Sequence, residues 1–317
     1  MSHLSNPLAT AEQLYQKSSV NSLPIELQDS IRYHTARLTQ AAGILLRLPQ
    51  DITAQANVLL FRYWLSDDLL QHEFSDVSAA IIYLTAKISA SPRSLRSITN
   101  VYAYLLSSAS VLLGPGKNDV KHDPASYYLS ESSYITFRNR LLHIEGQVLA
   151  ALGFNTHVAL PHPLAVTYLQ TLDVFSAAAQ PPKRGSVVAK RAIAYLNTAL
   201  LSPQLLYLTH QPCALATAAI YLAAREEGVR LPECEWWEVF DTEREELGFL
   251  VVGMKSLEGT ARDVSQRFEA KGMITRADIS HELKKTGLSS GGPDEVEDEE
   301  AEMARMLDAK VAAATAQ

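Results

Sequence analysis

Apolar residues recur at intervals of three and four along most of this chain, which is the spacing that places side chains on one face of an α-helix. One such stripe runs through Leu38, Ala41, Ala42 and Leu45. Alternation of apolar and polar residues, which is typical of a half-buried strand, is nearly absent. The sequence therefore predicts an all-α protein.

The periodic segments fall into two sets of helices. The first set is expected near residues 28–47, 51–65, 75–89, 92–108 and 131–152, with a loop at 109–130, and the second near 161–176, 186–201, 212–227, 232–240 and 242–257. The third helix of each set is apolar on almost every side, as a helix is when neighbours surround it. Each set is therefore predicted to be a five-helix bundle around its third helix.

Short motifs indicate where some of these helices begin. The Ser91-Pro92 pair is expected to open the fourth helix of the first set, and Gln211-Pro212 the third helix of the second, because proline is favoured at the first helical position. The stretch Thr242–Glu245 has the spacing of a capping box. After about residue 260 the periodicity weakens, and one short helix is expected to start near Thr275.

These patterns divide the chain into four parts. They are an N-terminal extension (1–27), a first bundle (28–152), a second bundle (153–257) and a C-terminal extension (258–317) that is predicted to be largely disordered. The extension contains an acidic run at 294–302 with seven acidic residues, which equals the whole net charge of −7. The remaining 28 acidic and 28 basic residues balance, so bulk charge does not favour direct nucleic-acid binding.

Other classes of function find little support in the sequence. The longest uncharged stretch, 192–224, is interrupted by proline-containing loops, so no membrane span is predicted. Cys213 and Cys234 are too few for a disulfide framework or an all-cysteine zinc site. His157 and His162 have no evident third metal ligand. Catalytic motifs are scarce, so we expect no cofactor, no metal and no small-molecule substrate.

Two charged residues break the apolar pattern. Glu145 falls within the apolar stripe of the helix at 131–152, and Lys87 follows Tyr83 and Leu84 at the end of the apolar third helix. Two interpretations are open. In the first, Lys87 extends from a helix end into solvent and Glu145 lies at the rim of its stripe. In the second, both lie at the edge of a protein interface, bonded to each other and to a partner.

The chain resembles the cyclins, which have two tandem five-helix cyclin boxes, and within them the L-type cyclins. The segments that carry the resemblance run through residues 28–257 and are Gln40–Gln50, Tyr83–Ile88, Ser91–Arg96, Glu145–Phe154, His157–Pro163 and Gln211–Arg225. The resemblance implies a non-catalytic regulatory subunit that binds and activates a cyclin-dependent protein kinase acting in transcription and RNA processing. It also implies a nuclear location.

The resemblance assigns a role to the two odd charges. In cyclins, a lysine that ends the third helix and a glutamate in the fifth bind the C-helix region of the kinase, and Lys87 and Glu145 occupy those positions. Further kinase contacts are expected from residues around this pair, namely Leu84, Ile88, Arg93, Arg96 and Leu149. Core packing, or a solvated arginine, is the alternative for each of them.

Two departures and two rival functions complete the expectations. Cyclins usually follow the lysine with a hydrophobic residue and two glutamates, whereas this chain reads Ile88-Ser89-Ala90, so two rim carboxylates are missing and partner choice is less defined. The printed sequence also lacks the Arg/Ser-rich region of many L-type cyclins.

Two other functions are weighed against that of a cyclin. The main alternative is a cyclin-fold transcription factor of the TFIIB type, which clamps DNA, and a helical enzyme is the third.

Overall fold

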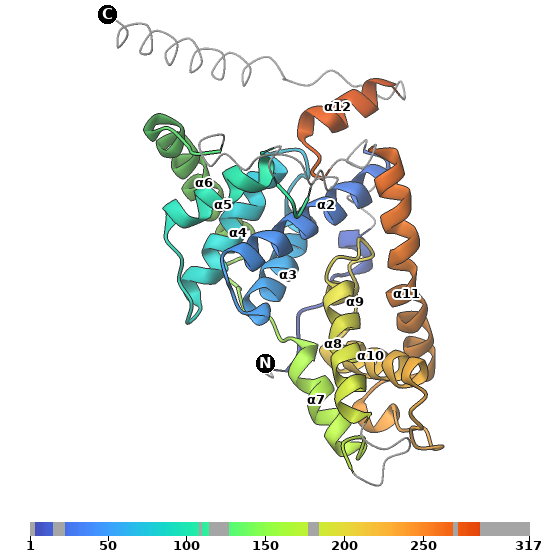
Figure 1. Ribbon diagram of the computed structural model, residues 1–317. Coiled ribbons are helices and arrows are strands. Elements are labelled where there is room, and N and C mark those ends of the chain that lie inside the picture. Colours follow the sequence, from blue (N-terminus) through green and yellow to red (C-terminus); the bar gives the residue numbers. More distant parts are fainter. Residues whose placement is uncertain are drawn as a thin grey trace, which may run out of the picture. The chain divides into compact units, whose positions relative to one another are not determined.

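The computed structural model describes residues 4–14, 23–107, 110–113, 127–176, 184–268 and 272–285. Within these ranges the regular structure is entirely helical, which confirms the predicted all-α class (Figure 1). No helix among the described residues is both long and apolar enough to cross a membrane. The chain up to Arg276 forms one compact unit, and the residues from Ala277 form a second.

The first bundle has its third helix at the centre, as predicted. Its helices are α2 (Ile25–Leu45), α3 (Gln50–Ser66), α4 (Phe74–Ile88), α5 (Leu95–Leu106) and α6 (Glu131–Ala151). Helix α4 packs against each of the other four (Figure 1). A polar chain fixes its register, because Ser78 Oγ lies 2.7 Å from both Thr39 Oγ1 of α2 and Tyr102 Oη of α5.

The second bundle repeats this plan around α10. Its elements are α7 (Pro161–Thr171), α8 (Gly185–Ala199), α9 (Leu206–Thr209), α10 (Pro212–Glu227), the 3₁₀ turn η2 (Glu238–Phe240) and α11 (Arg244–Arg267). Helix α10 packs against α7, α8 and α11, and its alanine-rich sequence allows the neighbours to approach closely. It begins at Pro212, as expected from the Gln211-Pro212 pair, and ends at Glu227, directly before Gly228, whose φ of 66° suits glycine.

Three local expectations are wrong. Helix α5 begins at Leu95 rather than residue 92, because Ser94 is the N-cap and its hydroxyl accepts a 3.1 Å hydrogen bond from Ser97 N–H. The capping box at Thr242 does not form; that hydroxyl donates to Phe240 O, and α11 begins at Arg244. The helix expected at 232–240 is only the short turn η2.

Helix α11 is longer than its sequence pattern indicated. It continues past the expected end at residue 257 to Arg267, and it buries Val264 and, directly after its end, Phe268. The short helix expected near Thr275 is present as α12 (Arg276–Lys285). The acidic run at 294–302 lies outside the described residues, and so do residues 114–126 of the loop expected at 109–130. The domain boundaries remain predictions.

An N-terminal segment joins the two bundles. Asn6 is 6% exposed, and its side-chain amide exchanges two hydrogen bonds of 2.8 Å with the backbone of Ala159, between α6 and α7. The Asn6 backbone exchanges two hydrogen bonds of 3.0 Å with the Gln211 side chain at the start of α10. Arg62 of α3 reaches Asn6 Oδ1 at 3.2 Å and His157 O at 2.7 Å. The segment around Asn6 therefore ties the first bundle to the second.

Candidate functional site

The two charges that break the apolar pattern form an ion pair. Lys87, in the last turn of α4, places its Nζ 2.8 Å from Oε1 of Glu145 in α6. The side chain of Lys87 is 52% exposed and that of Glu145 only 8%. A carboxylate that is this buried needs a cationic partner to offset its lost hydration. The pair therefore links two helices and presents the lysine, but not the glutamate, to solvent.

The surroundings keep Lys87 charged and held in place. The hydrogen bond to Glu145 raises the pKa of the Lys87 ammonium above its usual value. The ammonium also lies 5.3 Å from the centre of the Tyr83 ring, within the range of a cation–π contact. An ammonium has three N–H donors, and Glu145 is its single hydrogen-bond partner among the described residues. The exposed side of Lys87 can therefore donate to an acceptor on another protein.

Apolar side chains are exposed on the same two helices. Ile88 follows Lys87 directly and is 48% exposed, whereas Leu149, one turn beyond Glu145, is half-buried. Leu84 is 1% exposed and belongs to the core around α4, so it offers no area to a partner in the free chain. Of the three apolar candidates, Ile88 presents the most surface.

Phe154 is an exposed aromatic residue that the sequence pattern does not indicate as a contact. It lies just after α6, is 72% exposed and has a φ of 60°, directly after Gly153 with a φ of 56°. Its N–H donates to Leu149 O at 2.9 Å, so the turn is closed onto α6. Phe154 lay inside the Glu145–Phe154 segment that resembles cyclins, but its exposure depends on this left-handed turn, which periodicity does not reveal.

The two candidate arginines have partners within the chain. Arg93 donates from Nε to Leu46 O at 2.8 Å and from a terminal nitrogen to Arg47 O at 2.9 Å, which satisfies carbonyls at the end of α2. Arg96 pairs with Glu131 at 2.9 Å and lies 4.1 Å from the centre of the Tyr134 ring. Both therefore hold helices of the first bundle together.

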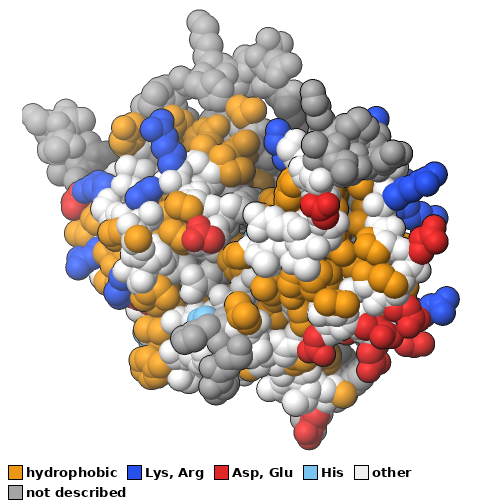
Figure 2. Space-filling model, turned by 90° about the horizontal axis from the view of Figure 1, so that it is seen from below, with side chains coloured by type: hydrophobic (Ala, Val, Ile, Leu, Met, Phe, Trp, Pro, Cys, Tyr) orange, Lys and Arg blue, Asp and Glu red, His pale blue; other side chains and the backbone are white. Residues whose placement is uncertain are grey.

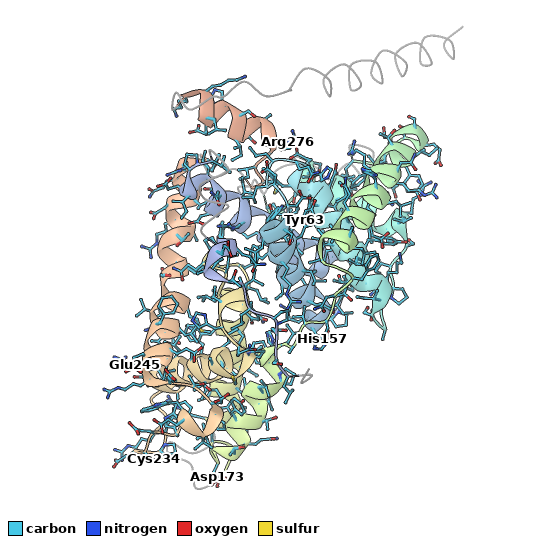
Figure 3. The ribbon with its side chains drawn as sticks, turned by 180° about the vertical axis from the view of Figure 1, so that it is seen from behind. Tyr63, His157, Asp173, Cys234, Glu245 and Arg276 are labelled. Carbon is cyan, nitrogen blue, oxygen red and sulfur yellow. The ribbon has the colours of Figure 1, made fainter. Side chains whose placement is uncertain are left out.

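The histidine and cysteine candidates form no metal-binding group among the described residues. His157, between the two bundles, and Cys234, in the loop after α10, lie far apart (Figure 3). His162 Nε2 is 2.9 Å from Asn197 Oδ1, and burial lowers the pKa of this imidazole. Burial likewise raises the pKa of the half-buried Cys213 thiol. The described residues contain no cluster of three or more side chains able to hold a metal ion.

Charged side chains do not gather in one groove on the face drawn in Figure 2. Lys and Arg side chains lie toward the edges of that face, with apolar and uncharged surface between them, whereas many Asp and Glu side chains gather toward its lower right and others lie singly nearer its middle. A protein that binds nucleic acid through its phosphates needs a continuous basic stripe. This face offers none.

Known proteins that are similar to this chain include two cyclins, each matching most of its length. No protein-family model matches the chain. Human Cyclin-L1 is 34% identical over 231 residues, which are 73% of this chain and 40% of that relative. Rat Cyclin-L2 is 32% identical over 246 residues, 77% of this chain and 43% of the relative. The chain thus spans less than half the length of these relatives.

A solved structure shares the fold. A chain in the crystal structure of the yeast RNA Pol II CTD kinase CTDK-1 complex superposes with a TM-score of 0.61 at 13% identity, covering 92% of this chain and 86% of that one. The two bundles and this likeness define a protein with the cyclin fold. Over the matched region the chain is related to the L-type cyclins, which confirms the resemblance expected from the sequence.

Proposed function

We propose that this chain is a non-catalytic cyclin subunit that binds and activates a cyclin-dependent protein kinase acting in transcription and pre-mRNA processing, in the nucleus. The observation that carries the proposal is the Lys87–Glu145 ion pair, with its lysine half-exposed beside the exposed Ile88. The relationship to L-type cyclins supports the kind of partner.

The physical role of the pair follows from its unequal burial. Glu145 fixes the position of the Lys87 ammonium before any partner arrives, so little side-chain entropy is lost on binding. The ammonium then donates to backbone carbonyls of the kinase, while Ile88, Leu149 and Phe154 supply apolar area around it. A central charged anchor surrounded by apolar contacts is a common arrangement for an energetic hot spot.

Activation then requires only that the cyclin bind the active form of the kinase more tightly than the inactive form. A kinase is active when its Lys–Glu ion pair is formed, which depends on the position of its C-helix. If the first bundle binds the active orientation of that helix more tightly than the inactive one, the equilibrium moves toward the active kinase. No catalytic group of the cyclin takes part in this step.

The test is co-expression with candidate transcription-related cyclin-dependent kinases, followed by size-exclusion chromatography and a kinase assay. The informative variant is the charge swap Lys87→Glu with Glu145→Lys, which keeps an internal ion pair but reverses the charge that faces solvent. We expect the wild type to co-elute with and activate one kinase, and the folded charge swap to do neither.

A matched control comes from the second bundle. Arg191 and Glu226 form an ion pair whose side chains are 45% and 41% exposed, so reversing it changes surface charge away from the proposed surface. The Arg191→Glu, Glu226→Arg variant should bind the kinase like the wild type. Equal binding by the Lys87/Glu145 swap would refute the site, and no kinase binding by the wild type would refute the function.

A further inference from the structure

Two Ser-Pro pairs occur in the sequence, and the structure treats them differently. Ser202, before Pro203, is 1% exposed, and its hydroxyl accepts a 3.3 Å hydrogen bond from Gln204 N–H. Ser91, before Pro92, is only partly buried, and Pro92 is exposed. The Ser91 hydroxyl is neither sealed from solvent nor hydrogen-bonded to any described residue. Of the two, only Ser91 is available to a modifying enzyme.

The backbone around Ser91 is not part of a helix. Residues 89–94 form a non-helical connection between α4 and α5. The connection is folded back on α4, because Ser89 Oγ donates to Ala86 O at 2.9 Å and accepts from Ser91 N–H at 3.1 Å. Protein kinases bind their substrates as extended segments, so binding at Ser91 requires the two Ser89 hydrogen bonds to open but no helix to unwind.

A guanidinium is already positioned beside Ser91. A terminal nitrogen of Arg93 lies 3.4 Å from Ser91 O and 3.2 Å from Pro92 O, while Nε and the other terminal nitrogen hold carbonyls at the end of α2. Arg93 pairs with no carboxylate among the described residues. Arginine is the side chain best suited to bind a phosphate, because its planar guanidinium can donate two hydrogen bonds to one phosphate.

We propose that Ser91 is a phosphorylation site for a proline-directed protein kinase and that Arg93 binds the resulting phosphate. The Ser91 Oγ attacks the γ-phosphorus of ATP, the bond from that phosphorus to the bridging oxygen of ADP breaks, and the hydroxyl proton passes to the kinase's catalytic base. The product carries a charge of about −1.5 to −2. At the carbonyl end of α4 such an anion needs a cation, and Arg93 supplies it.

The modification would act on the proposed kinase-binding surface, and this step rests on the proposed function. The Ala86–Ser89–Ser91 hydrogen bonds keep Ser91 beside the last turn of α4, which contains Lys87. The negative charge of a phosphate there offsets the positive charge of Lys87. The phosphate also loses its hydration when a partner covers this surface. Phosphorylation of Ser91 therefore weakens association with the activated kinase.

The acceptor assignment is tested on the full chain alone. Wild type, Ser91→Ala and Ser202→Ala are incubated with a purified mitogen-activated protein kinase and Mg²⁺-ATP, and phosphate is located by mass spectrometry. We expect phosphate on Ser91 in the wild type and in Ser202→Ala, and its loss in Ser91→Ala. A wild type without phosphate on Ser91, or with phosphate on Ser202 instead, overturns the assignment.

The role of Arg93 is measured by ³¹P NMR of the singly phosphorylated chain. Arginine binding favours the dianion, so the second pKa of the phosphate should be lower in the folded protein than in a phosphopeptide of residues 87–97. Arg93→Gln should return it to the peptide value, and circular dichroism checks that this variant folds. Equal values in folded wild type and peptide overturn the contact with Arg93.

The regulatory step is tested with the kinase that co-elutes with the unmodified chain. Phosphorylated wild type should bind it about tenfold more weakly, mainly through a slower association rate. Unchanged affinity overturns the regulatory role and leaves the proposed function standing. If no kinase binds the unmodified chain, the proposed function fails and the regulatory role with it, whereas the acceptor assignment is decided by the mass measurement alone.

Discussion

At the scale of single residues, the Lys87–Glu145 pair couples stability to the proposed function. The two side chains contribute unequally because one is buried and the other is half in water. Removing the lysine leaves an uncompensated carboxylate in a nearly dry position, whereas neutralising the glutamate leaves a lysine that water can solvate. The cost of breaking the pair therefore depends on which partner is removed.

We expect Lys87→Ala to lower the free energy of unfolding by ~1–3 kcal/mol and Glu145→Gln by less, about 1 kcal/mol. Urea unfolding followed by circular dichroism measures both. The control is Arg191→Ala, which removes an exposed ion-pair partner and should lower stability by less than about 1 kcal/mol. Equal losses for Lys87→Ala and Glu145→Gln would contradict the buried position of Glu145.

At the scale of elements, packing decided where several helices begin and end. The apolar stripes predicted most helices within a few residues, because a helix that buries one face must repeat at three and four. The start of α5 depended on competition between two capping serines: Arg93 holds the connection to the end of α2, so Ser94, not Ser91, became the N-cap. A single sequence does not show that tertiary contact.

The same reasoning explains which parts of the site were predictable. Lys87 and Glu145 stood out because charges in an apolar stripe are rare, and the structure brings them within 2.8 Å. Periodicity gives no signal for Phe154, because this residue follows the end of α6 in a turn of two successive left-handed residues. Leu84 lies close to Lys87 in the sequence, yet it is buried in the core around α4.

The N-cap of α5 provides a test at this scale. Replacing Ser94 by alanine removes the acceptor for Ser97 N–H and should destabilise the chain by about 1 kcal/mol, whereas Ser94→Asp should restore the cap and favour the helix dipole. Thermal unfolding measures both variants. Ser91→Ala serves as the matched control, since Ser91 caps no helix, and a loss as large as that of Ser94→Ala would contradict the assigned start of α5.

At the scale of the whole molecule, polar contacts between the bundles respond to pH. His162 of α7 contacts Asn197 of α8, which in turn accepts a 3.0 Å hydrogen bond from Gln50 of α3. Burial lowers the pKa of His162 below its ordinary value of 6.5. The unfolded chain therefore binds the proton more readily, so stability is complete above pH 6.5 and falls as the pH drops below it.

We expect the urea midpoint to decrease between pH 7.5 and pH 5.5, and His162→Gln to reduce this decrease. His210, whose pKa is also lowered by burial, accounts for a further part, and a His162→Gln, His210→Gln chain should show the smallest dependence. His281, with a side chain 79% exposed, is the control histidine. A pH dependence unaffected by His162→Gln but removed by His281→Gln would contradict this account.

The attachment of the N-terminal segment determines whether the two bundles unfold as one. Asn6 holds the backbone of Ala159 by two hydrogen bonds and receives a third from Arg62, so Asn6→Ala leaves buried polar groups without partners. Such groups cost ~1–3 kcal/mol each, because neither water nor protein satisfies them. Asn6→Ala should therefore broaden the thermal transition and increase hydrogen exchange at the Ala159 amide, while leaving exchange within α4 unchanged.

Thr10→Ala, which alters the exposed hydroxyl that accepts from Gln13 N–H in the same segment, is the control. If Asn6→Ala unfolds in one transition as sharp as that of the wild type, the bundles are coupled mainly through their helices, and the segment is an accessory to that coupling.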